Sequence, residues 1–72
     1  MKREPPAAPK IVRRILRKQD VSVLTGLSSP TIGRLEASGN FPRRVQLAAN
    51  SVGWYSDEVE AWRDARPRVG TP

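Results

Sequence analysis

Apolar residues recur at two different spacings along the chain, and the change of spacing separates two kinds of element. Between residues 18 and 39 they stand mostly three positions apart, as on one face of a helix. Between residues 44 and 55 they alternate with polar or small residues, as in β-strands. After residue 55 the helical spacing returns. This order predicts two helices, then a hairpin, then a third helix.

The first helix is predicted over residues 18–25. Val21 and Leu24 share one face of it, Asp20 lies in the first turn where the helix dipole favours an acid, and Gly26 ends it. The next helix follows almost directly. Two short helices joined by a short turn that contains glycine form the helix-turn-helix pattern, which also occurs in proteins that bind no nucleic acid.

The second helix, over residues 28–38, carries its own start and stop signals. Ser28 is a suitable N-cap, because its hydroxyl can accept a hydrogen bond from a backbone N–H of the first turn. Gly39 is placed for a left-handed C-cap. Ile32 and Leu35 share the face that we expect to be buried. The opposite face holds Pro30, Gly33, Arg34 and Ala37. Such a face can press closely into a groove, and we interpret this helix as a DNA-recognition helix.

The alternating region at residues 44–55 predicts a hairpin with one apolar face and a loop at residues 48–51. The side chains expected on the apolar face are Val45, Leu47, Val52 and Trp54. The other face and the tip carry the polar residues Arg43, Arg44, Gln46, Asn50 and Ser51. A hairpin after a helix-turn-helix is the arrangement of a winged helix, whose wing reaches phosphates or the minor groove. The alternative is a structural hairpin whose polar face meets water.

Residues 11–16 precede the first helix and combine β-branched apolar residues with two arginines. Periodicity alone leaves open a strand or the lead into a helix, and the helix signal that follows favours a short strand ending near Leu16. Beside this segment lies a basic cluster formed by Arg13, Arg14, Arg17 and Lys18. The cluster either contacts phosphates or is a solvated run of charge.

A third helix is predicted over residues 57–66, capped by Ser56 and stopped by Pro67. Its acidic first turn and basic last turn match the helix dipole. It holds four of the seven acids, so this face should turn away from DNA. The complete expected core is Ile15, Leu16, Val21, Leu24, Leu27, Ile32, Leu35, Phe41, Val45, Leu47, Val52, Trp54, Val59 and Trp62.

The chain divides into one domain and two ends. Residues 11–66 are the predicted domain, residues 1–10 a disordered, basic and proline-rich arm, and residues 67–72 a flexible tail.

The 13 lysines and arginines exceed the 7 acids and give a net charge of +6. This balance favours a polyanionic partner, nucleic acid before an acidic membrane surface, although composition alone weighs a merely basic protein equally.

The absence of cysteine and histidine excludes several kinds of chemistry at once. Disulfides, thiolate nucleophiles, the usual zinc sites and a histidine general base all require one of these residues. The acids of the last helix are explained by capping and solubility, no phosphate-binding glycine loop is present, and no base stands ready to activate a serine. We therefore expect no enzyme activity and no cofactor.

A cysteine-free chain without an apolar run of about 18 residues or a signal peptide fits the cytoplasm.

With these elements in place, residues 16–66 resemble the AlpA family of prophage regulatory proteins, small relatives of the MerR-type and excisionase-type winged helices. The segments that carry the resemblance read LTGLSSPTIGRLEASGNFP, RRVQLAANSVGW and SDEVEAW. This chain departs from the family at two positions. Gly33 stands where a bulky aromatic is usual, and Pro30 replaces a usual lysine or arginine.

The resemblance implies a DNA-binding protein of a mobile element, acting as a transcriptional activator or as an excisionase-like factor that bends attachment-site DNA. The second helix of such proteins enters the major groove, and the wing contacts the minor groove or the backbone. The implied protein partners are an integrase or recombinase, or RNA polymerase. The sequence leaves both roles open.

We therefore predict an α+β fold, a small winged helix-turn-helix with three helices and a two- or three-stranded antiparallel sheet. It should bind specific double-stranded DNA as a monomer in solution, with cooperativity on DNA left open. The predicted DNA-binding residues are Ser28, Ser29, Thr31, Arg34, Arg43, Arg44, Gln46, Asn50 and Ser51. The alternative from another class is a small adaptor or antitoxin-like module that docks an acidic protein.

Overall fold

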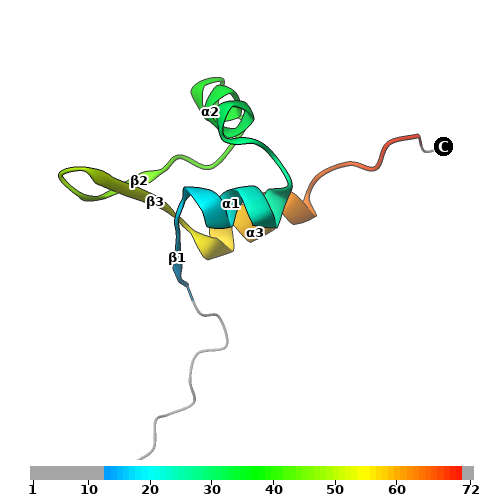
Figure 1. The fold of residues 1–72 in the computed structure, drawn as a ribbon. Coiled ribbons are helices and arrows are strands. Elements are labelled where there is room, and N and C mark those ends of the chain that lie inside the picture. Colours follow the sequence, from blue (N-terminus) through cyan, green and yellow to red (C-terminus); the bar gives the residue numbers. More distant parts are fainter. Residues whose placement is uncertain (1–12, 71–72) are drawn as a thin grey trace, which may run out of the picture.

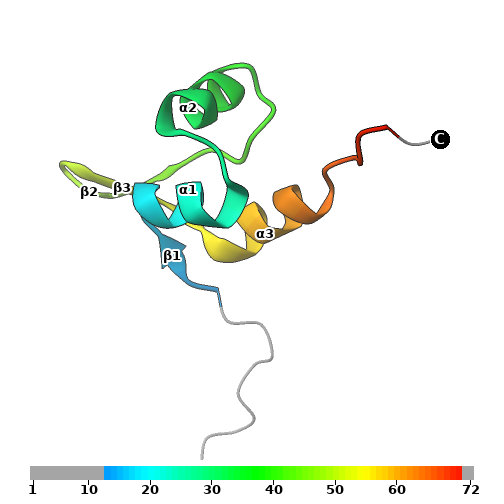
Figure 2. The ribbon, with the colours of Figure 1, turned by 45° about the vertical axis from the view of Figure 1, so that its right-hand side comes forward.

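The computed structural model describes residues 13–70, so the predicted arm at residues 1–10 lies outside the described residues. The elements run in the order β1 (Ile15–Leu16), α1 (Lys18–Thr25), α2 (Ser29–Ala37), β2 (Val45–Ala48), β3 (Ser51–Tyr55) and α3 (Ser56–Asp64). Helices α1 and α3 pack together, α2 lies beyond them, and the hairpin β2–β3 extends to one side (Figures 1 and 2). The predicted α+β class, with three helices and a three-stranded sheet, is confirmed.

Helices α1 and α2 begin and end where their capping signals predict. The Ser28 hydroxyl accepts a hydrogen bond from the Thr31 backbone N–H at 3.4 Å, as expected of an N-cap. Gly26 and Gly39 follow α1 and α2 with φ angles of +77° and +82°, in the left-handed region that favours glycine. Over residues 13–70, none of the helices is long and apolar enough to cross a membrane.

The prediction that Ser56 caps the third helix is wrong. Helix α3 starts at Ser56 itself, with Tyr55 in the cap position, and it ends at Asp64 rather than at residue 66. The Ser56 side chain is buried, and its hydroxyl accepts from the Arg14 backbone N–H at 2.8 Å. The Ser56 N–H in turn donates to the Arg14 carbonyl at 2.7 Å. Because the Ser56 hydroxyl bonds to the Arg14 backbone, it is not available to cap its own helix.

The sheet is antiparallel in the order β1-β3-β2, with Leu16 opposite Trp54 and Val45 opposite Gly53. Opposite residues of antiparallel strands point to the same face. Leu16 and Trp54 therefore face the helices, whereas Val45 lies on the other face with Gly53. The predicted apolar face, which joined Val45 and Leu47 to Val52 and Trp54, is wrong. A register displaced by one residue exchanges the two faces of a strand.

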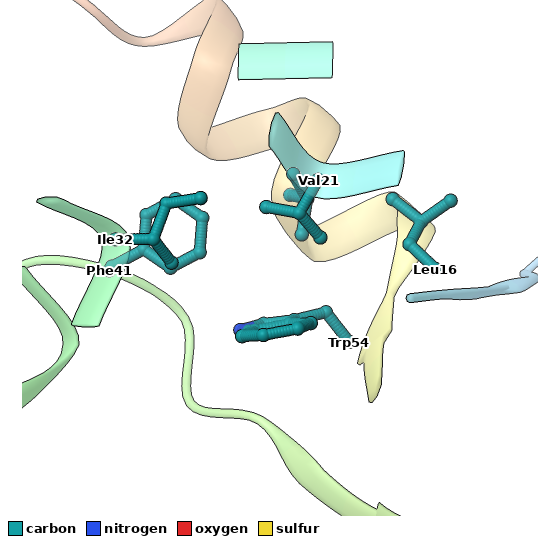
Figure 3. Packing of buried hydrophobic residues seen from close by; sticks show 6 residues of the cluster. Leu16, Val21, Ile32, Phe41 and Trp54 are labelled. Atoms are coloured by element: carbon teal, nitrogen blue, oxygen red, sulfur yellow. The ribbon is translucent and has the colours of Figure 1, made fainter. Parts of the chain in front are cut away.

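The core lies between the helices and the inner face of the sheet. Its buried members are Leu16, Val21, Ile32, Phe41, Trp54 and Val59, with Leu24, Leu27, Leu35 and Trp62 packed against them. Figure 3 shows the Trp54 ring as the floor of this cluster, with Val21 above it. These ten were all predicted.

Two predicted core residues lie at the surface, Ile15 at 40% exposure and Leu47 at 41%. Both point to the outer face of the sheet, where their methyl groups lie 2.6 Å (Ile15) and 3.1 Å (Leu47) from the place that a Cβ of residue 53 would occupy. Val45 and Val52 are half-buried and outside the cluster. Glycine at position 53 thus lets two apolar side chains close over the strand.

Candidate nucleic-acid interface

The exposed side of α2 carries a row of hydrogen-bonded polar side chains. The Ser28 and Thr31 hydroxyl oxygens lie 2.9 Å apart, and the Arg34 Nη2 donates to the Thr31 hydroxyl at 3.2 Å. We call these three residues the α2 row. Ser29, the fourth candidate on this helix, is half-buried and makes no side-chain hydrogen bond within residues 13–70. The row places one guanidinium beside the N-terminal half of α2, where backbone N–H groups and the helix dipole favour an anion.

The surface beside this row is small. A Cβ added at Gly33 would meet nothing within 4 Å, and Ala37 is exposed one turn further on. A shallow groove between α2 and the start of the hairpin is lined by Gly33, Glu36, Ala37, Arg43 and Arg44. Nothing in the described part of the chain fills the space over Gly33, so a ligand can approach the backbone of α2 closely here.

Arg44 does not extend freely into this groove. Its Nη2 and Nε donate to Glu36 Oε1 at 2.7 and 2.9 Å, and its backbone N–H donates to Glu36 Oε2 at 2.6 Å. The guanidinium also lies over the Trp54 ring, 4.9 Å from its centroid. The structure therefore holds this predicted wing contact against α2 and the core. Its contact with DNA stays a prediction.

The charge of Glu36 is stabilised by this partner. Burial raises the pKa of the carboxyl, but the hydrogen bonds and the positive charge of Arg44 outweigh burial and hold the pKa below its ordinary value of 4.5. Arg44 has a raised pKa, chiefly through the side-chain hydrogen bond with Glu36. Both side chains are therefore charged at any pH above the lowered pKa of Glu36.

We expect the pair to make folding pH-dependent in acid. Because the folded pKa of Glu36 is lower than the unfolded one, its contribution to stability is present above pH 4.5 and is lost as the pH falls through the folded pKa. Urea unfolding followed by circular dichroism at about pH 7 and about pH 3 should show a larger loss for the wild type than for Glu36→Gln. Asp57, whose pKa is also lowered, titrates in both proteins and so cancels in the difference. Equal losses would contradict the role of Glu36.

The remaining wing candidates differ in their exposure and in the hydrogen bonds that their side chains make. Arg43 is exposed, and its side chain makes no hydrogen bond or ion pair within residues 13–70. Gln46 donates to the carbonyls of Ala48 and Ala49 and so braces the hairpin turn. Asn50 lies exposed in that turn, and Ser51 opens β3 half-buried. The structure thus brings Arg43 to the groove beside α2 and leaves Asn50 at the distant tip.

Two features of this region were missed by sequence reasoning. The pairing of Glu36 with Arg44 is not predicted, because the two residues are eight positions apart and the turn after Gly39 lies between them. The sequence predicts for Arg13 either a phosphate contact or a solvated charge. It instead pairs with Asp57 at 3.0 Å and Glu58 at 3.3 Å and lies 3.8 Å over the Tyr55 ring. The beginning of the described chain is thereby attached to α3.

Comparison with known proteins gives two matches to this chain. The family model described as "Prophage CP4-57 regulatory protein (AlpA)" matches residues 14–67. An uncharacterized protein, ORF88, of Enterobacteria phage P4 is 43% identical over 53 residues, which are 74% of this chain and 60% of that protein. The chain therefore spans less than two thirds of the length of this relative. No solved structure matches. Since the family model covers three quarters of the sequence, from the strand before α1 to the end of α3, the chain belongs to the AlpA family of prophage regulatory proteins.

Proposed function

We propose that this protein binds double-stranded DNA in a sequence-specific manner, with α2 in the major groove and the hairpin β2–β3 as the wing. The observation that carries the proposal is the α2 row, in which Thr31, itself bonded to Ser28, accepts a hydrogen bond from Arg34 on an otherwise small and open helix face. Arginine paired with guanine O6 and N7 is the commonest specific contact between proteins and DNA. An arginine already held by the protein loses less side-chain freedom on binding.

The other candidate residues fit contacts that position the duplex. Ser28, Ser29 and Thr31 lie at the N-terminus of α2, which suits phosphate oxygens or the nearest base edges. Arg43 lies just before the wing, and Asn50 and Ser51 lie in it, where a phosphate or the minor groove would be met. The acidic first turn of α3 is engaged by Arg13 instead. Under this proposal the base readout rests mainly on Arg34, and the wing supplies much of the affinity.

In its biological setting we propose a regulator of a prophage or related mobile element in the bacterial cytoplasm. Family membership supports regulation within a prophage. Two outcomes of DNA binding fit it: activation of a promoter, with RNA polymerase as the partner, or excision, with an integrase or recombinase as the partner. The protein is proposed to be a monomer in solution.

The test is a footprint. The purified full chain would first be used to select a duplex from a random library, and nuclease protection would then be mapped over the host element with excess competitor DNA. Specific binding gives a fixed protected region. Protection beside an attachment core supports excision, and protection upstream of a promoter supports regulation. An adaptor that docks an acidic protein gives no fixed footprint, and that result would overturn the proposal.

Replacing Arg43 with alanine should weaken binding to all DNA sequences alike. The exposed guanidinium is proposed to neutralise one phosphate, so its loss should reduce the slope of log K against log salt by about one unit. The measurement is fluorescence anisotropy over a salt series with cognate and random duplexes. Arg68→Ala removes the same charge from the exposed segment after α3 and is the matched control. An unchanged slope for Arg43→Ala would exclude the phosphate contact.

Replacing Gly33 with alanine should stabilise the fold and weaken DNA binding. Alanine in a helix interior is favoured over glycine by about 0.8–1 kcal/mol, and a Cβ at position 33 meets nothing in the protein. On DNA, however, the added methyl group would keep the backbone of α2 away from the groove. Urea unfolding and anisotropy on the cognate duplex measure the two effects. Tighter or equal DNA binding would show that α2 makes no close approach at this position.

A further inference from the structure

We propose that Glu36 and Arg44 form a positioning clamp, which holds the wing against α2 in the geometry where both meet DNA. The inference rests on the proposed DNA-binding function. It makes Glu36 a residue that promotes binding, although its negative charge lies in the groove that would face phosphates.

The clamp is built from both the side chain and the backbone of Arg44. One carboxylate oxygen of Glu36 takes the guanidinium at 2.7 Å, and the other takes the Arg44 backbone N–H at 2.6 Å. A backbone hydrogen bond fixes the path of the chain into β2 and not only the place of one side chain. The Glu36 side chain is 10% exposed, so water screens this pair less than it screens a surface ion pair.

This pair is the main polar connection between the two parts of the interface. Within residues 13–70, no other side-chain hydrogen bond or ion pair joins α2 to residues 43–55. The hairpin packs chiefly within the sheet, and α2 packs chiefly on α1. The Arg44 guanidinium also lies over the ring of Trp54, which is buried. Arg44 therefore fixes the angle between the wing and α2, because it contacts both Glu36 on α2 and Trp54 in the core.

Charge alone predicts that Glu36 weakens DNA binding, which is the opposite of what the clamp predicts. An unpaired carboxylate beside Arg43 and Gly33 would repel a phosphate, and its removal would raise affinity. In the clamp, Arg44 neutralises the carboxylate and leaves the charge of Arg43 for DNA. Removing Glu36 would free Arg44 but would release the wing. The sign of the effect on affinity therefore separates the two descriptions.

The experiment compares Glu36→Gln with Glu60→Gln, which removes the same charge from an exposed position of α3. Dissociation constants are measured by anisotropy on the selected duplex, at a temperature where circular dichroism shows all the proteins folded. We expect Glu36→Gln to raise Kd about tenfold, within the range known for coupled neighbouring groups. Glu60→Gln should leave Kd unchanged or lower it slightly. Equal or tighter binding by Glu36→Gln would overturn the clamp.

A shortened duplex separates positioning from simple destabilisation. The cognate duplex is trimmed on the wing side until Arg43→Ala no longer changes its Kd. On this short duplex the wing has nothing to contact, so Glu36→Gln should bind as well as the wild type. A loss of equal size on both duplexes would mean that the substitution damages α2 itself, and it would contradict positioning.

A double-mutant cycle adds a test on Arg44. If the two residues act as one unit, Glu36→Gln with Arg44→Gln should bind no more weakly than either single variant. If Arg44 contacted a phosphate directly, its replacement would weaken binding further in the Glu36→Gln protein, and the clamp would be rejected. A wild-type protein that binds no duplex specifically would overturn the proposed function and the clamp together. If the wild type binds a duplex specifically and Glu36→Gln binds it equally well, the clamp alone would be overturned.

Discussion

Arg34→Ala is expected to cost about 1–3 kcal/mol of binding free energy on the cognate duplex and to relax specificity at one base pair. Arg34 is the one long side chain on the open face of α2, and Thr31 holds its guanidinium at 3.2 Å. Under the proposed function, its removal would take away a bidentate contact with guanine that no neighbour on this face can replace. The measurement is a Kd series over duplexes that each differ from the selected site by one base pair.

The control for Arg34→Ala is a substitution that keeps the positive charge and removes the planar guanidinium. Lysine offers a point charge without the planar fork that matches guanine, so Arg34→Lys should retain general affinity and still lose the preference at that base pair. Thr31→Val tests the hydrogen bond that orients the arginine and should have a smaller effect in the same direction. If Arg34→Ala bound the cognate duplex like the wild type, the assignment of α2 as the recognition helix would be wrong.

Trp54→Ala is expected to destabilise the fold by about 3–5 kcal/mol, the usual cost of removing a large buried aromatic side chain. Trp54 is 1% exposed and forms the floor of the core, where it packs with residues from β1, α1 and α2 (Figure 3). Small domains have total stabilities of roughly 5–15 kcal/mol, so this loss would leave much of the protein unfolded at moderate temperature. Circular dichroism during urea unfolding measures it.

Trp54→Phe is the matched control, because it keeps an aromatic ring and removes the indole N–H. That N–H is buried and has no hydrogen-bond partner within the described residues. An unsatisfied buried donor costs about 1–3 kcal/mol, so its removal should offset part of the packing that phenylalanine loses. We therefore expect Trp54→Phe to fold with a far smaller loss. A loss as large as that of Trp54→Ala would mean that the N–H is needed in the folded protein.

The helices could be predicted closely because their boundaries depend on local signals. Ser28 and Gly39 define α2 through bonds within a few residues of themselves, and Gly26 does the same for α1. The spacing of Val59 and Trp62 likewise places one face of α3 on the core. Such signals act whatever the rest of the chain does, and the sequence contains them in full.

The parts that could not be predicted depend on partners far along the chain. The faces of the hairpin are set by register, and the irregularity between Gln46 and Ala48 has no signature in an alternating pattern. Ser56 has the composition of a cap but bonds to Arg14, 42 residues earlier. In the candidate site, the α2 row follows from helical spacing. The pairing of Arg44 with Glu36 requires knowing how the chain turns after Gly39.

The hydrogen bonds between Arg14 and Ser56 and the ion pairs of Arg13 with α3 have a consequence for how this protein can diverge. They close the fold using only the segments before α1 and after β3. All the residues proposed to meet DNA lie between those segments. Under the proposed function, a change of DNA target would therefore involve substitutions on the exposed side of α2, for example at Gly33, that leave these bonds intact. A lineage of such proteins can keep one framework while its members acquire different binding sites.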